Sequence, residues 1–95
     1  MYDESIVANP GAKFATISGT ATVFIGMVAR RFYLLTSTVT IAFVQGTAPV
    51  ATFGTGSTVQ SPRISAILDG GNGPSVSVLG SAAGIATLTP ITILG

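Results

Sequence analysis

Glycine and proline interrupt this chain, over most of its length, at intervals too short for helices of normal length. Its 95 residues include 12 glycines and 5 prolines, and both residue types break helices and mark turns. The segments between them are rich in threonine, valine and isoleucine, whose β-branched side chains suit a pleated, half-buried surface. The pattern therefore favours a fold of many short strands joined by turns.

Several segments alternate apolar and polar residues, as half-buried strands do. Val39, Ile41 and Phe43 are expected to share one face of a strand, and Val76 and Val78 to face the core. The expected strands lie at residues 13–17, 20–25, 30–36, 38–44, 63–68, 75–79, 85–89 and 91–94, with a brief strand at 50–53. Short strands at this spacing are typical of sandwiches and barrels. We predict an all-β fold, a single small β-sandwich that is jelly-roll-like.

The domain division predicted is an extended N-terminal arm at residues 1–11 and a β-sandwich domain at residues 12–95. The arm ends at the turn signal Asn9-Pro10-Gly11. Its apolar residues Ile6 and Val7 cannot bury much against so small a domain. We expect the arm either to be disordered or, in an assembly, to dock on a neighbouring copy by strand addition.

The chain carries unusually little charge for its length. Charged residues make up 7% of it and hydrophobic residues 47%, whereas soluble domains have about 25% charged residues. Much of the surface is therefore expected to contact other protein, which predicts a homo-oligomer. The net charge of +1 gives no strong field to attract nucleic acid, so no nucleic-acid partner is expected.

The residue inventory argues against an enzyme. The chain has no histidine and no cysteine, which excludes disulfides and thiolate metal sites and leaves no usual base for its serines. We expect no catalytic residue, no cofactor and no metal. Asp69 and the glycines after it suggest calcium, but one carboxylate supplies too few ligands, and a turn in which Asp69 bonds its own backbone is favoured.

Neither a membrane span nor a secretory signal is expected. The uncharged stretch from Phe32 is broken by hydroxyl residues, Gly46 and Pro49, short of the roughly 20 apolar residues that a helix needs to cross a bilayer. The sequence opens with acidic Asp3 and Glu4 and shows no apolar region of the signal-peptide kind.

Arg30 and Arg31 form the one charge cluster within the expected strands. They either bind a carboxylate or phosphate or are a solvated pair that guards a sheet edge. If they have a partner, Asp3 and Glu4 of an adjacent copy are the natural candidates. The predicted interface residues are Asp3, Glu4, Ile6, Val7, Arg30 and Arg31.

From Arg31 onward, the order of segments resembles a small structural protein of tailed bacteriophages. The stretches that carry the resemblance are RFYLLTS (31–37), VTIAF (39–43), QGTAPVAT (45–52), PSVSVL (74–79) and SAAGIATL (81–88). Members are compact all-β virion proteins, and some capsid cement proteins have a jelly-roll-like sandwich that forms a trimer on the capsid. The resemblance covers about two thirds of the chain.

The resemblance implies a capsid decoration, or cement, protein. Such a protein would be made in the host cytoplasm and would bind the major capsid protein across subunit seams on the capsid exterior, as a homo-oligomer, a trimer. Two alternatives are open: another virion component, such as a head-fibre base or tail protein, and a self-assembling extracellular filament subunit that uses strand exchange.

Overall fold

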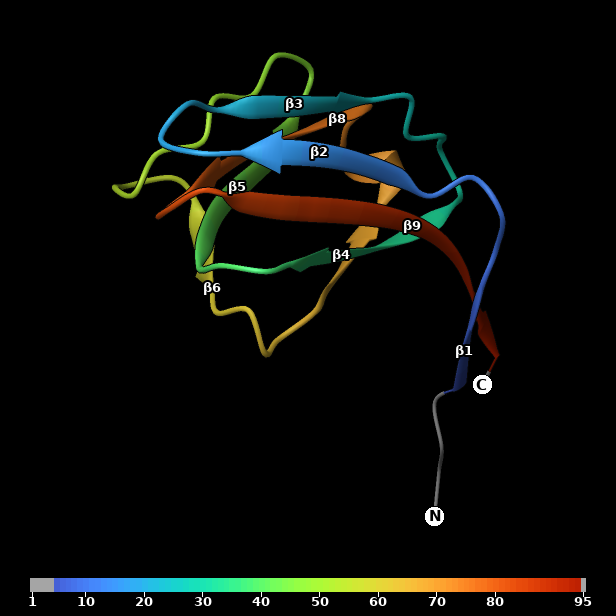
Figure 1. Cartoon of the computed structure of the whole chain (residues 1–95). Coiled ribbons are helices and arrows are strands. Elements are labelled where there is room, and N and C mark those ends of the chain that lie inside the picture. Colours follow the sequence, from blue (N-terminus) through green and yellow to red (C-terminus); the bar gives the residue numbers. More distant parts are fainter. Residues whose placement is uncertain (1–4, 95) are drawn as a thin grey trace.

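The structure is a computed structural model that describes residues 5–94 and forms two antiparallel sheets (Figure 1). The strands are β1 (Ser5–Ala8), β2 (Lys13–Ile17), β3 (Thr22–Ile25), β4 (Phe32–Ser37), β5 (Ile41–Gly46), β6 (Thr58–Gln60), β7 (Ala66–Asp69), β8 (Ser75–Gly80) and β9 (Gly84–Leu94). A 3-10 turn, Gly70–Asn72, follows β7. Sheet A has the order β1-β9-β4-β7, with β2 also paired to β9, and sheet B has the order β3-β8-β5-β6.

Strand order identifies the sandwich as a jelly roll. Leaving β1 aside, the sheets are β2-β9-β4-β7 and β3-β8-β5-β6, so that the chain crosses from one sheet to the other at almost every connection. This arrangement is the eight-stranded, double-sheet form of a jelly roll. The predicted all-β, jelly-roll-like sandwich is confirmed.

Apolar side chains from both sheets fill the space between them. Ile41 and Phe43 of β5 and Val76 and Val78 of β8 lie in this core, as their alternation predicts. The remaining members of the buried cluster are Ile17, Phe24, Met27, Tyr33, Leu35, Leu68, Ala86 and Leu88. Gln60 reaches across from sheet B, where its side-chain Nε2 donates a 3.2 Å hydrogen bond to the Leu35 carbonyl of sheet A.

A loop at residues 47–57 lies against the outer face of sheet B. The Ala51 amide donates a 3.1 Å hydrogen bond to the Ser77 hydroxyl of β8, and both residues are buried. The brief strand expected at residues 50–53 is wrong, because the segment meets β8 through a side-chain hydroxyl and joins no strand ladder.

Pro90 does not end a strand, contrary to the sequence expectation. β9 runs unbroken from Gly84 to Leu94. Its pairing with β2 ends at Leu88 and its pairing with β1 begins at Ile91, so Pro90 lies at the gap between those two partners. There its carbonyl accepts from the Asn9 amide at 2.8 Å, and its missing N–H falls where the pairing with β1 ends.

The turn at Asp69 has the expected form. Its carboxylate oxygen accepts a 2.9 Å hydrogen bond from the Gly71 amide, and the Gln45 side-chain amide holds the same loop by donating to the carbonyls of Asp69 (2.7 Å) and Gly73 (3.0 Å).

The part of the arm that the structure describes is ordered on its own chain. Residues Ser5–Ala8 form β1, which pairs antiparallel with β9, whereas the sequence led us to expect disorder or docking on another copy. Ile6 and Val7 nevertheless remain exposed. The division into an arm at 1–11 and a domain at 12–95 stays a prediction.

Candidate assembly interface

The outer face of sheet A is covered by no other element among the described residues. Tyr33 and Leu35 of β4 point into the core, so the alternate residues Phe32 and Leu34 point outward. Residues that pair across an antiparallel sheet share a face. The partners of Phe32 and Leu34 in β7 and β9 therefore also point outward, and so do the residues of β1 and β2 that pair with the outward-pointing residues of β9. Its exposed large side chains are Ile6, Phe14, Phe32, Ile67 and Ile85.

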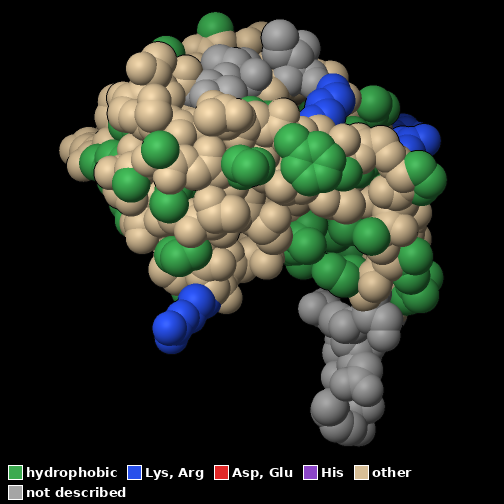
Figure 2. Space-filling view, in the orientation of Figure 1, with side chains coloured by type: hydrophobic (Ala, Val, Ile, Leu, Met, Phe, Trp, Pro, Cys, Tyr) green, Lys and Arg blue, Asp and Glu red, His purple; other side chains and the backbone are tan. Residues whose placement is uncertain are grey.

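Very little charge interrupts this face. Among the strand residues of sheet A, register puts only one charged side chain, Asp69, on it. Figure 2 shows hydrophobic side chains spread among uncharged ones over β2 and β9, with lysine and arginine at the margins. The aromatic ring of Phe14 is 71% exposed. Register also places Thr16, Thr36, Thr87 and Thr89 on this face, so exposed apolar side chains alternate with hydroxyl groups. A face with this many exposed large apolar side chains is suited to contact with other protein.

A two-stranded ribbon extends from one end of sheet A (Figure 1). The pairing of β4 with β9 ends at Phe32 and Ile91, whereas β1 continues to pair with β9 as far as Leu94. Two-stranded ribbons are marginally stable in water. Because Ile6, Val7 and Leu94 are exposed on it, the ribbon would gain stability by contact with another surface.

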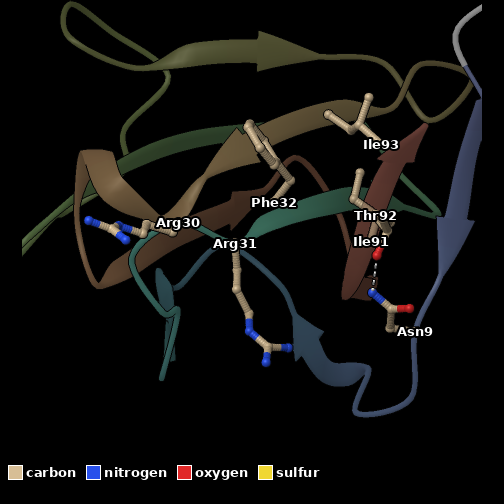
Figure 3. A pocket seen from close by; sticks show the side chains of 7 residues that line it. All are labelled: Asn9, Arg30, Arg31, Phe32, Ile91, Thr92 and Ile93. Atoms are coloured by element: carbon tan, nitrogen blue, oxygen red, sulfur yellow. Dashed lines mark hydrogen bonds between the residues drawn. The ribbon is translucent and has the colours of Figure 1, made fainter. Parts of the chain in front are cut away.

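A pocket lies where β9 extends past the start of β4, and we call it the β9 notch. Its cavity volume is about 390 Å³ and its lining residues are Asn9, Arg30, Arg31, Phe32, Ile91, Thr92 and Ile93 (Figure 3). The Asn9 side-chain amide donates a 3.0 Å hydrogen bond to the Thr92 hydroxyl. The notch thus combines apolar side chains, hydrogen-bonding groups and two cations.

A tight turn before β4 creates the notch. The Arg31 amide donates to the Val28 carbonyl at 3.2 Å, and the Gly70 amide donates to the Arg31 carbonyl at 2.8 Å. Arg30, the third residue of this turn, has a φ of +68°, in the left-handed region that favours glycine. These contacts lead the chain away from β9 and leave the β4 side of residues 92–94 without a neighbouring strand among the described residues.

The two arginines point in different directions from the rim of the notch. In Figure 3, Arg31 extends to the same side as Asn9, while Arg30 points away from Ile91 and Ile93. Both are exposed, and neither forms an ion pair with another described residue.

The structure brings together some of the residues predicted for the interface. Arg30 and Arg31 both line the notch, and Ile6 and Val7 lie on β1; Asp3 and Glu4 lie outside the described residues. Sequence reasoning missed Asn9, Phe32 and residues 91–93 as part of the same surface. Alternation does place Phe32 opposite Tyr33, but alternation alone does not tell which side faces the core.

The described residues contain no cluster of three or more histidine, cysteine, aspartate or glutamate side chains that would suit a metal ion. Nor does any helix within residues 5–94 have the length and apolar character of a membrane span.

Comparison with known proteins identifies the fold. No protein-family model and no curated protein matches the chain. One solved structure does, described as "Bacillus endospore appendages form a novel family of disulfide-linked pili". Its TM-score is 0.52 and its identity 19%, and the match covers 99% of this chain and 93% of that one. The two proteins share a fold over nearly their whole lengths.

Proposed function

We propose that this protein is a structural subunit that assembles with copies of itself into an extracellular filament. The observation that carries this proposal is the uncovered apolar outer face of sheet A. The loop at residues 47–57 lies against the outer face of sheet B, where its Ala51 and Ser77 of β8 are both buried, so the two sides of the sandwich differ. The exposed side suits an interface and is ill suited to permanent contact with water.

Similarity to a pilus subunit supports an extracellular filament over a capsid partner. The matching structure belongs to endospore appendages, and the likeness extends along 99% of this chain. The capsid decoration reading gains no support from these comparisons, and neither does the major capsid protein as a partner.

The subunits would be held together without disulfide links. The pili of the matching structure are described as disulfide-linked, whereas this chain has no cysteine. Stable interfaces bury about 1,200–2,000 Å² in total, and apolar burial contributes roughly 25 cal/mol per Å² before the costs of association. The outer face of sheet A, repeated in every copy, would supply the apolar part of such an interface.

The substitution Phe14→Lys tests this proposal. It places a charge on the most exposed apolar side chain of this face, on the edge strand β2, and we expect a rise of about tenfold or more in the protein concentration needed for assembly. Sedimentation and negative-stain electron microscopy of purified protein measure that concentration. Because Phe14 is 71% exposed, the free energy of unfolding of the monomer should change by no more than about 0.5 kcal/mol.

Val50→Lys is the matched control, because Val50 is also 71% exposed but lies in the loop at 47–57. It should assemble like the wild type. Wild-type protein that stays monomeric at every concentration would refute the proposed function. Equal assembly of the Phe14 and Val50 variants would show that the outer face of sheet A is not the interface.

A further inference from the structure

We propose that the β9 notch of one copy binds residues 1–4 of a second copy, with Asp3 and Glu4 against Arg31. This inference rests on the proposed function and names the contact that would link one subunit to the next. It follows from three properties of the notch as residues 5–94 form it: a strand edge without a partner, a cation without an ion pair and an apolar lining.

The backbone of Ile93 provides the open edge. Two hydrogen bonds show which way the backbone groups of β9 point. On the β4 side, the amide of Thr38, the residue after β4, donates to the Ile85 carbonyl. On the β1 side, the amide of Asn9, the residue after β1, donates to the Pro90 carbonyl. Odd-numbered residues of β9 therefore direct their backbone groups toward β4 and even-numbered ones toward β1. Ile93 continues the odd series past the end of β4, so no described strand pairs with its N–H and C=O, and an added strand can bond to them.

The charges on the two sides are complementary. Arg31 lines the same notch as Ile93 and extends toward the side of Asn9 (Figure 3). The chain has three acidic residues, and one of them, Asp69, already accepts a hydrogen bond from its own turn. Asp3 and Glu4 are adjacent in the sequence, so one short segment carries two carboxylates, opposite in charge to Arg31 and to Arg30 at the rim.

The remaining residues of the segment match the apolar part of the notch. Met1 and Tyr2 precede the two acids, and Phe32, Ile91 and Ile93 line the cavity of about 390 Å³. Because neighbouring side chains of an added strand point to opposite faces, the segment can direct an apolar side chain toward Phe32 and Ile93 and the carboxylate next to it toward the guanidinium group.

The direction of β1 favours a second copy over the same chain. Ser5 pairs with Leu94 and Ala8 with Ile91, so β1 enters the ribbon at the end away from the notch and runs toward it. Residues 1–4 connect at Ser5, the far end. Reaching the notch of the same chain would require them to reverse direction along the ribbon, whereas the notch of another copy imposes no reversal.

Charge reversal in full-length protein tests the contact. Arg31→Glu places a negative charge against the acidic segment, and Asp3→Lys with Glu4→Lys places positive charge against the notch. We expect each variant to need about tenfold or more protein for assembly. An equal mixture of the two variants should recover near-wild-type assembly, because each segment then meets an opposite charge on the other variant.

The control is Arg63→Glu, which makes the same charge change at an exposed turn between β6 and β7. If Arg31→Glu and Arg63→Glu assemble equally well, the inference is wrong and the proposed function stands. If the mixture fails while the three substitutions combined in one chain restore assembly, the segment binds its own notch, and a second copy is excluded. A wild type that does not assemble would overturn both.

Discussion

At the scale of single residues, the strain at Arg30 is the least expected feature of the chain. A non-glycine residue at a φ of +68° costs about 1–2 kcal/mol relative to the right-handed conformation. The turn at residues 28–31 needs this conformation at its third position, where glycine is the usual residue. Here that position bears a cation at the rim of the notch.

Replacing Arg30 with glycine should therefore stabilise the monomer. Relief of the left-handed strain outweighs the greater flexibility of unfolded glycine, which costs about 0.5–1 kcal/mol. We expect Arg30→Gly to raise the free energy of unfolding by about 0.5–1 kcal/mol, measured by urea denaturation. Ala29→Gly in the same turn, where φ is not positive, should lower it. A glycine at position 30 that destabilises as much as one at 29 would disprove the strain.

The sequence marks Arg30 and Arg31 as a pair of interest but does not predict their geometry. Charge patterning alone singles them out, since they are the one charge cluster within the strands expected from the sequence, whereas the structure places both in the turn before β4. Nothing in the residues around them signals a turn that requires positive φ, because such turns are recognised by glycine or asparagine. Their relation to residues 91–93 depends on a strand pairing some sixty residues apart, which no local pattern contains.

At the scale of elements, the turn before β4 depends on Gly70. A Cβ atom added at Gly70 would fall on the Val28 carbonyl oxygen and within 3.2 Å of the Arg31 carbonyl oxygen. The backbone of this turn therefore packs directly on the 3-10 turn after β7, and the position of Arg31 follows from that contact.

Gly70→Ala should displace the turn and lower the free energy of unfolding by about 2–3 kcal/mol, because the clash is with backbone that cannot rotate aside. Thermal or urea unfolding measures the change. Gly19→Ala serves as the control, since an added Cβ there meets nothing within 4 Å. Equal stability of the two variants would contradict the packing.

Most strand positions could be predicted from the sequence, but the continuity of β9 through Pro90 could not. Alternation identifies the strands around Ile41, Phe43, Val76 and Val78, because one face of each is buried. Proline at position 90 suggests a break, yet β9 is continuous because the gap between β1 and β2 lies beside it. That exception depends on which strands pair with β9, which the local sequence does not specify.

At the scale of the whole molecule, the scarcity of charge predicts association but not its location. Phe32 and Leu34 alternate with Tyr33 and Leu35, and all four are apolar or aromatic. Either pair would suit the core by its composition. The structure resolves the choice by burying Tyr33 and Leu35, which leaves sheet A with an apolar outer face.

Assemblies of this protein should respond to denaturant and not to reductant. With no cysteine in the chain, no disulfide can link the copies, and we expect non-covalent contacts to hold them together. We expect moderate urea to dissociate the assemblies to the same extent with and without a thiol reductant, as measured by sedimentation. Protein that remains assembled in concentrated denaturant would point to a covalent link other than a disulfide.

The place of β9 in the ladder also sets the order in which the protein can fold. It is the last strand of the described chain, and β1, β2 and β4 all pair with it. During synthesis, β1 and β2 therefore cannot pair until β9, near the other end of the described chain, has been made. Strand pairings between residues so far apart in sequence are slow to form. The apolar face of sheet A is complete only when β9 is in place, so a nascent chain lacks the surface that would bind other copies.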